Sequence, residues 1–349
     1  MMLTRLKLAV GVLVMISACS SDKSLMDDVT HAPAYDWRIE RDEWGVPTAI
    51  GATDAGAAYA LAIAHAEDDF ATLQSVVFSA KGMAGRIKGK EGAASDFLHA
   101  LLKINEQLET YYDESLSSEV KSIVDAYADG LNRYAADHPD ERIDGPWPIT
   151  GRDIAGGFIL SSPLFYGLDY EIGGLVAGTL NPCAGQLAQG DEGCGSNAFA
   201  VAPHASADGS TFLLINPHNP WDGPLAWYEA RLHSDAGWRV AGGMLAGSPF
   251  PTGAIYNDAF ASAPTVNRPD LVDHYQLTTN DKDQYYVDGQ WRPFEKKVIW
   301  LKVKFGPIIL PIRRTLTYTV HGPAFELESG WVAVSFPDSA ADGTSIKML

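Results

Sequence analysis

The residue pattern changes character near position 195, and this change constrains the fold more than any other feature. Asp54 to about Ala80 is rich in alanine and apolar residues and is followed by Gly82, which predicts a buried helix. Residues 118–134 carry apolar side chains at three- and four-residue spacing, which predicts a second helix. We expect a third helix over Asp96 to about Leu108, so the first half is mainly helical.

From Ser196 onward the chain instead contains short alternating or β-branched runs separated by Gly, Pro, Asp and Asn, as in antiparallel strands joined by turns. The runs are Ala198–Val201, Thr211–Ile215, Trp238–Ala241, Val298–Val303 and Leu316–Val320. One earlier strand-like run, Tyr35–Glu40, leads into a turn at Gly45-Val46-Pro47. A helical part followed by a strand-rich part predicts an α+β protein.

Residues 1–19 form a targeting segment. Arg5 and Lys7 precede an apolar stretch from Leu8 to Ile16 that ends in Ser17-Ala18-Cys19. Small residues before a cysteine resemble the bacterial lipoprotein signal, in which the peptide is cut before Cys19 and its sulfur carries lipid. An ordinary secretory signal with an incidental cysteine is the alternative. Both imply export to the periplasm, and Ser20 in place of aspartate favours tethering to the outer membrane.

The formal net charge is −18, which argues against nucleic acid as a partner because phosphate contacts need clustered Lys and Arg. Besides Cys19, the cysteines are Cys183 and Cys194. An oxidising compartment favours a disulfide between them, and two free thiols are the alternative.

Amide cleavage needs an activated nucleophile. In many serine hydrolases the serine lies in a Gly-x-Ser-x-Gly motif and is activated by a histidine and a carboxylate. No serine of this chain lies in such a motif. A serine at a chain start can instead use its own α-amino group as base, since that group has a pKa near ~8. Gly195-Ser196 suits such a start, because glycine leaves the preceding carbonyl open to attack. Taken alone, however, Gly195-Ser196-Asn197 is typical of an ordinary turn.

Seven motifs, in order along nearly the whole exported chain, resemble the penicillin acylase family of N-terminal-nucleophile (Ntn) hydrolases, and within it the acyl-homoserine-lactone acylases. They are Arg41-Asp42-Glu43-Trp44-Gly45-Val46-Pro47, Ala64-His65-Ala66-Glu67-Asp68, Gly195-Ser196-Asn197-Ala198-Phe199-Ala200-Val201, Ser206-Ala207-Asp208-Gly209, Asn216-Pro217-His218, Thr265-Val266-Asn267-Arg268-Pro269-Asp270 and His321-Gly322-Pro323.

The resemblance implies that Ser196 is the nucleophile, released by autocleavage of the Gly195–Ser196 bond. It implies that His218 orients the serine's amino group or aids processing; an ordinary loop histidine bonded to backbone is the alternative. We expect Asn216 and Trp221 to shape the turn and pack beside the site. The backbone N–H of the oxyanion hole aligns with Val266, with Thr265 as a close competitor.

The resemblance also implies a structural calcium ion in some members, here with Glu171, Asp270, the Val272 carbonyl and Asp273 as oxygen ligands; solvated surface carboxylates are the alternative. It implies no cofactor for catalysis. The implied fold is the Ntn-hydrolase αββα sandwich, C-terminally incomplete, made from α- and β-like chains of one precursor. The expected segments are a signal at 1–19, a helical segment at 20–195 whose end from about Gly174 is a removable spacer, and the start of the β-like domain at 196–349.

The expected function is hydrolysis of an N-acyl amide, an N-acyl-homoserine lactone or a related small molecule. The alternatives are a β-lactam side-chain acylase and a truncated, inactive lipoprotein of the same scaffold. The sequence ends at Leu349, before the family segment that supplies the oxyanion asparagine. Loss of one such donor costs about 10²- to 10³-fold in rate. We therefore expect the 349 residues alone to be an inefficient enzyme.

Overall fold

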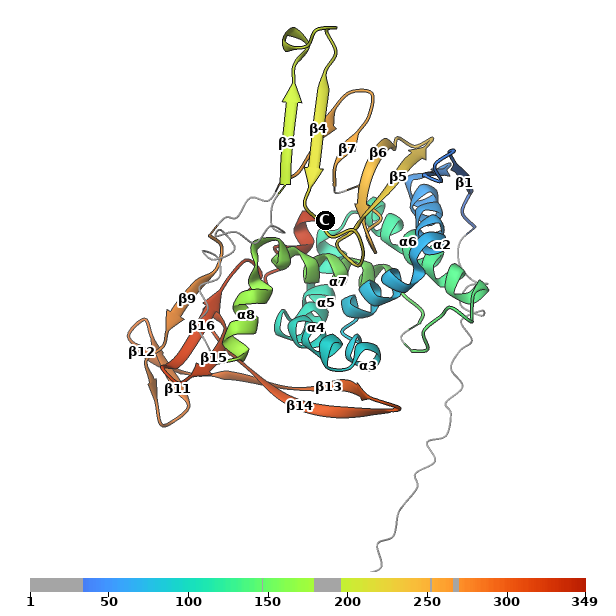
Figure 1. Ribbon diagram of the computed structural model, residues 1–349. Coiled ribbons are helices and arrows are strands. Elements are labelled where there is room, and N and C mark those ends of the chain that lie inside the picture. The colour runs from blue at the N-terminus through green and yellow to red at the C-terminus, as the bar shows by residue number, and fades with distance from the viewer. Residues whose placement is uncertain (1–33, 146, 179–195, 252, 266–269) are drawn as a thin grey trace, which may run out of the picture.

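The structure, a computed structural model, describes residues 34–145, 147–178, 196–251, 253–265 and 270–349. Helices dominate up to residue 178 and strands dominate from residue 196 (Figure 1). This confirms the prediction of an α+β protein with a helical first half and a strand-rich second half. Within the described ranges, none of the helices combines the length and apolarity that a bilayer crossing requires.

The two main predicted helices are present. Helix α2 (Asp54–Ala80) begins after Thr53, whose hydroxyl oxygen accepts a hydrogen bond from the Gly56 N–H, and it is interrupted at Asp69. Helix α6 (Ser118–Asp137) begins after Ser117, whose side chain caps the Val120 N–H. The other described helices are α3 (Gly85–Lys88), α4 (Lys90–Leu101), α5 (Ile104–Ser115), α7 (Gly151–Ser161) and α8 (Leu168–Val176), with a short 3₁₀ segment η1 (Ser162–Tyr166) before α8.

The single helix predicted over Asp96 to Leu108 is wrong, because the structure has two helices there. Helix α4 ends at Leu101 and α5 begins at Ile104. Lys103 between them has φ of 51°, a left-handed conformation that ends a right-handed helix. The side-chain nitrogen Nε2 of Gln107 donates a hydrogen bond to the Leu102 carbonyl oxygen (2.8 Å), which satisfies a backbone acceptor freed by the break.

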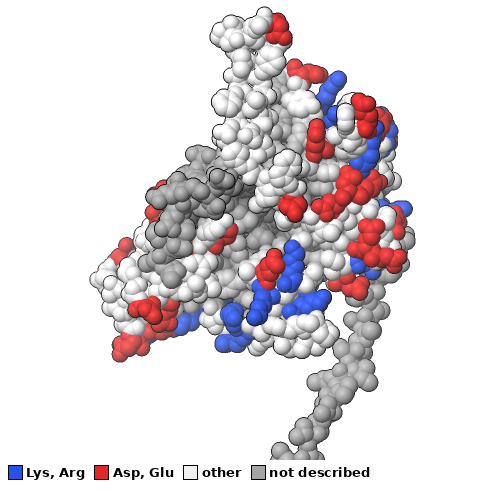
Figure 2. Space-filling view, viewed as in Figure 1, with Lys and Arg blue, Asp and Glu red and all other residues white. Residues whose placement is uncertain are grey.

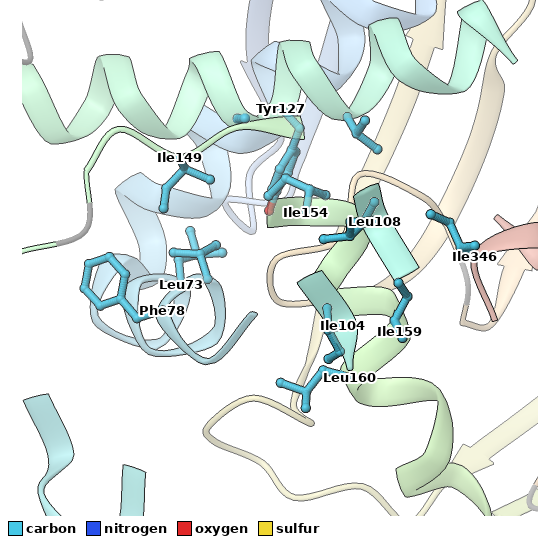
Figure 3. Packing of buried hydrophobic residues seen from close by; sticks show 14 of the residues in the cluster. Leu73, Phe78, Ile104, Leu108, Tyr127, Ile149, Ile154, Ile159, Leu160 and Ile346 are labelled. Carbon is cyan, nitrogen blue, oxygen red and sulfur yellow. The ribbon is translucent and has the colours of Figure 1, made fainter. Parts of the chain in front are cut away.

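The main hydrophobic core is centred on the helices of the first half and extends to buried residues of the strand-rich half. Helices α2 and α6 pack closely because small residues face each other: a Cβ added to Gly130 would lie 2.7 Å from the Ala62 Cβ. Phe78 of α2 and Tyr127 of α6 are fully buried in the same cluster (Figure 3). The Ala-rich sequence of α2 therefore reflects tight helix packing.

The predicted strands are present with shifted ends, and the sequence reading missed several others. The described strands are β1 (Trp37–Arg41), β2 (Pro47–Gly51), β3 (Ser196–Val201), β4 (Phe212–Pro217), β5 (Trp227–Ser234), β6 (Arg239–Leu245), β7 (Ile255–Tyr256), β8 (Ala261–Ser262), β9 (Asp273–Gln276), β10 (Thr279–Asn280), β11 (Gln284–Val287), β12 (Gln290–Pro293), β13 (Glu295–Phe305), β14 (Ile308–Thr319), β15 (Gly322–Leu327) and β16 (Gly330–Ser335).

One sheet joins the two halves of the chain. Its strand order is β1-β2-β5-β6-β7-β8, so β2 from the first half pairs with β5 from the second. This pairing is parallel, with Thr48 opposite Arg231 and Gly51 opposite Ser234. A second sheet has the order β13-β14-β15-β16-β9, and a small one has the order β10-β11-β12.

Strands β3 and β4 form a hairpin that projects from the helical body (Figure 1). Within the described residues the two strands pair only with each other. Phe199, Phe212 and Leu214 on this hairpin are each more than half exposed. The αββα arrangement of stacked sheets stays a prediction.

Candidate functional site

Ser196 is the first residue of strand β3. Its Cα lies opposite that of Pro217 on β4, and the residue is partly buried. Gly195 and both remaining cysteines, Cys183 and Cys194, lie outside the described residues. The cleavable bond, the disulfide and Cys19 therefore stay predictions.

His218 follows Pro217 directly and lies at the same end of the hairpin as Ser196. Its Nε2 is 3.1 Å from the side-chain amide nitrogen of Asn197. An amide nitrogen only donates, so Nε2 is the acceptor in this contact. Sequence reasoning placed His218 near the nucleophile, but it missed Asn197 as the residue that connects them.

The expectation that Trp221 packs beside the site is wrong for the described residues. Its side chain is fully exposed. Asn216 is exposed and lies opposite Asn197 in the strand register. The following turn is held instead by Asn219, whose side-chain amide donates to the Leu225 carbonyl oxygen at 2.8 Å.

Of the two candidates for the backbone oxyanion donor, Thr265 is the last described residue before the undescribed residues 266–269. Thr265 is exposed and belongs to no strand, and Val266 lies outside the described residues. The structure therefore does not choose between them.

The four residues proposed as calcium ligands divide into one buried and three more accessible positions. Glu171 on α8 is buried, with its Oε2 3.4 Å from Nε2 of His274 on β9. Asp270 and Asp273 are exposed and Val272 is half-buried. In the ranges that the structure describes, no three or more His, Cys, Asp or Glu side chains gather in a way that could hold a metal ion. As placed here, these residues do not fit a complete calcium site.

A shallow depression of about 370 Å³ lies on the shared sheet, at β6 and the segment around β7. Trp238, Pro251 and Phe260 line it, together with Arg239 and Asp258, whose side chains are 3.4 Å apart. Neither Ser196 nor His218 lines it, so we assign it no role in the reaction.

The first two motifs form a polar network to which the sequence reading gave no role. The Arg41 guanidinium donates hydrogen bonds to Glu67 Oε2 (2.8 Å) and Asp68 Oδ2 (2.9 Å), and to the carbonyl oxygens of Gly45 and Ala64. These bonds fix the β1–β2 turn against α2. Partial burial acts to lower the pKa of Arg41, but the hydrogen bonds to the two carboxylates outweigh it and raise the pKa.

The same network reaches β5, on the other side of the expected cleavage point. The Tyr228 hydroxyl donates to Asp68 Oδ2 at 2.6 Å, and burial together with this bond raises the pKa of Tyr228. Its ring stacks on the imidazole of His65 with centroids 4.1 Å apart. Burial lowers the pKa of His65 to about 4, so this ring is neutral at pH 7. Arg231 on β5 adds an ion pair with Asp42 (2.9 Å).

The chain matches the penicillin amidase family over residues 36–348. It is 25% identical over 318 residues to an acyl-homoserine lactone acylase PvdQ of Pseudomonas fluorescens, covering 82% of this chain and 40% of that protein. It is 25% identical over 351 residues to an aculeacin-A acylase of Actinoplanes utahensis, covering 90% of this chain and 44% of that protein. It is 26% identical over 308 residues to the penicillin acylase 2 proenzyme of a Pseudomonas species, covering 74% of this chain and 39% of that protein.

The chain thus spans about 40% of the length of the curated relatives it matches. The family match, in contrast, covers nearly all of this chain, and it contains Ser196, His218 and the Arg41 network. The chain therefore belongs to the penicillin amidase family.

Proposed function

We propose that this chain carries the first catalytic segment of an N-acyl amide hydrolase whose nucleophile is Ser196. The observation that carries the proposal is the position of Ser196 at the start of strand β3, with His218 at the same end of the hairpin through its contact with Asn197. Family membership supports the reaction class, because the names of the relatives describe acylases. Acylases hydrolyse linear, that is non-cyclic, amides.

The proposed maturation starts with attack of the Ser196 hydroxyl oxygen on the Gly195 carbonyl carbon. The hydroxyl proton passes to the departing amide nitrogen, so the Gly195 acyl group moves from nitrogen to oxygen. Water then hydrolyses this ester, which leaves a Gly195 carboxylate and a free α-amino group on Ser196. That amine is the base for the next reaction. It takes the Ser196 hydroxyl proton as the oxygen attacks the acyl carbon of the substrate, and the proton passes to the departing amine of the substrate. Water then hydrolyses the acyl ester on Ser196 and releases a carboxylic acid.

His218 has a positioning role in this proposal. Its contact with the Asn197 side chain ties the residue that follows Ser196 to the end of β4. We propose that this tie helps to hold the start of β3 in its extended conformation. The expected result of losing His218 is slower maturation with an unchanged fold.

We propose an N-acyl-homoserine lactone or a related lipid-like amide as the substrate. The similarity to acyl-homoserine lactone acylases of several pseudomonads supports this class. A β-lactam side-chain acylase is the second candidate, supported by the similarity to the penicillin acylase 2 proenzyme. Hydrolysis of a long-chain acyl-homoserine lactone but not of a phenylacetyl amide would separate the two.

Several further expectations belong to this proposal. They are a lipid on Cys19, a periplasmic location at the outer membrane, an αββα sandwich, and segments that divide at residues 19 and 195. Asp270 and Asp273 are exposed, so their side chains would have to move toward Glu171 to bind a structural calcium ion there. An equilibrium calcium titration followed by thermal unfolding tests it, and an unchanged unfolding temperature would exclude it.

Mass spectrometry of the purified chain tests the maturation step. We expect a new chain that starts at Ser196, its absence in Ser196→Ala, and its retention at a lower rate in Ser196→Cys, since a thiol can also attack. An intact wild-type chain under all conditions would contradict autocleavage. Hydrolysis is then assayed separately, so that a processed but inactive chain is distinguished from an unprocessed one.

A further inference from the structure

A long hairpin formed by β13 and β14 differs from the rest of this acidic protein in its charge. Residues 295–319 contain Lys296, Lys297, Lys302, Lys304, Arg313 and Arg314, and Glu295 is their single acidic residue. The chain as a whole has a formal net charge of −18. Figure 2 shows Lys and Arg side chains gathered along the lower edge of the molecule, where Figure 1 places this hairpin.

The two faces of the hairpin have different surroundings. On the inner face Val303, Leu316 and Tyr318 are buried, and β13 lies against α3 and α4. The contact with α3 is close, because a Cβ added to Gly85 would lie 2.9 Å from the Lys302 carbonyl oxygen. The hairpin is therefore a fixed part of the fold with one face turned outward.

The outer face, defined by register, combines apolar and cationic side chains. Cross-strand partners on this face are Trp300 with Arg313, Lys302 with Pro311 and Lys304 with Ile309. Between Val298 and Thr315 the outer face consists of Val298, Trp300, Lys302, Lys304, Ile309, Pro311, Arg313 and Thr315, all of them exposed.

The large apolar side chains of the outer face are exposed. Trp300 is 59% exposed, and Ile309 is 47% exposed. The ion-paired charges of the hairpin, within the described residues, are Glu295, Lys296 and Lys297 near its base. Lys302, Lys304 and Arg313 on the outer face form no ion pair there. Exposed apolar groups beside uncompensated cations indicate a surface that binds an anionic and partly apolar partner.

We propose that the outer face of the β13–β14 hairpin docks on the surface of a bilayer that contains anionic phospholipid. Tryptophan and aliphatic side chains favour the boundary between headgroups and acyl chains, and the lysine stems reach past them to the phosphates. The remaining surface is acidic and is repelled by the same headgroups, so the hairpin is the side that faces the membrane. The inference rests on charge complementarity and does not depend on the proposed enzymatic activity.

Vesicle cosedimentation of the full chain tests this proposal. We expect stronger binding to phosphatidylcholine vesicles that contain phosphatidylglycerol than to phosphatidylcholine alone, and weaker binding at high salt. Lys302→Glu with Lys304→Glu should lower partitioning into the anionic vesicles by about tenfold or more, since each cation contributes separately. The matched control, Lys282→Glu with Arg239→Glu, makes the same charge change at exposed positions elsewhere and should change partitioning by less than about twofold.

A local readout separates the hairpin from any binding by residues 1–19, which are the same in every variant. Quenching of tryptophan fluorescence by brominated lipid should decrease in Trp300→Phe, and circular dichroism should show an unchanged fold. Equal partitioning of the hairpin and control variants would overturn the proposal. So would a dimer in size-exclusion chromatography that Trp300→Ser with Ile309→Ser dissociates, or tighter binding to single-stranded DNA than to vesicles.

Discussion

The helical segment and the β3–β4 hairpin differ in where their apolar side chains lie. Phe78 and Tyr127 in the helices are fully buried, whereas Phe199 on β3 is 62% exposed and Phe212 on β4 is 51% exposed. Burial of apolar area is the main source of stability, so the helices hold the fold together. The strand that begins with Ser196 contributes little to this core. Changes near the candidate nucleophile should therefore affect chemistry more than folding.

A pair of phenylalanine truncations should give the largest difference between the two regions. We expect Phe78→Ala to lower the free energy of unfolding by about 3–5 kcal/mol, because it leaves a cavity in a packed core. Phe199→Ala removes the same atoms from an exposed strand and should change it by less than about 0.5 kcal/mol. Urea unfolding followed by circular dichroism measures both.

Equal losses in these two variants would contradict the comparison. They would mean that the hairpin packs against another surface in solution, so that Phe199 is not exposed. The slope of the unfolding free energy against urea serves as the control, since it should be the same in both variants.

Local patterns allowed the sequence to predict α2 and α6, because alanine content and three- to four-residue spacing reflect the packed faces of single helices. The break between α4 and α5 was missed, since Lys103 adopts a left-handed conformation without a glycine to indicate it. Strand β5 was missed too, although its parallel pairing with β2 joins the two halves. Pairing across such a separation leaves no local signal.

The candidate site was predictable to a similar extent. Motif order placed Ser196 and His218 together, and the strand register supports their proximity. It did not reveal the Asn197 contact, nor that Arg41, Asp68 and Tyr228 form one network, since these residues are far apart in the chain. Trp221 was misplaced, because its exposure depends on the course of the turn after β4, which the motif does not determine.

Acidification should give the second-largest effect, because it lowers the free energy of unfolding through a buried histidine of the helical segment that resists protonation. Burial lowers the pKa of His99 to about 4, below the unfolded value of about 6.5. Between pH 6.5 and 4 the unfolded chain therefore binds more protons than the folded one. The contribution of the neutral His99 to the free energy of unfolding is complete above about pH 6.5 and is lost as the pH falls toward 4. We expect His99 to account for about 2–3 kcal/mol of that loss.

Urea unfolding at a series of pH values measures this effect. His99→Gln should flatten the dependence between pH 6.5 and 4, and its stability at pH 7 is compared separately. His204→Gln, at an exposed position after β3, is the matched control and should leave the slope unchanged. An unchanged slope in His99→Gln would show that this ring is accessible to protons in the folded state.

A smaller effect is expected where the first half contacts β5. Tyr228→Phe removes the hydroxyl that donates to Asp68 at 2.6 Å and keeps the ring that stacks on His65. We expect a loss of about 1–1.5 kcal/mol, the usual net value for such a bond. Tyr256→Phe, at a half-exposed position on β7, should have no measurable effect. A similar loss in both variants would place the stabilisation in general strand packing rather than in the network of Arg41, Asp68 and Tyr228.

Surface ion pairs should give the smallest difference between the regions. Arg133 and Asp137 lie one turn apart on α6 at 2.6 Å, whereas Arg239 and Asp258 in the strand-rich half are 3.4 Å apart and 74% and 84% exposed. Double-mutant cycles to alanine should give about 0.3 kcal/mol for the helical pair, at the low end because the cation precedes the anion in the helix. The second pair should give a value close to zero, because two freely moving side chains lose entropy on pairing and gain little in water. High salt should reduce the first value further. A coupling above about 1 kcal/mol for Arg239 and Asp258 would instead indicate that the shallow depression they line is more enclosed than its exposure suggests.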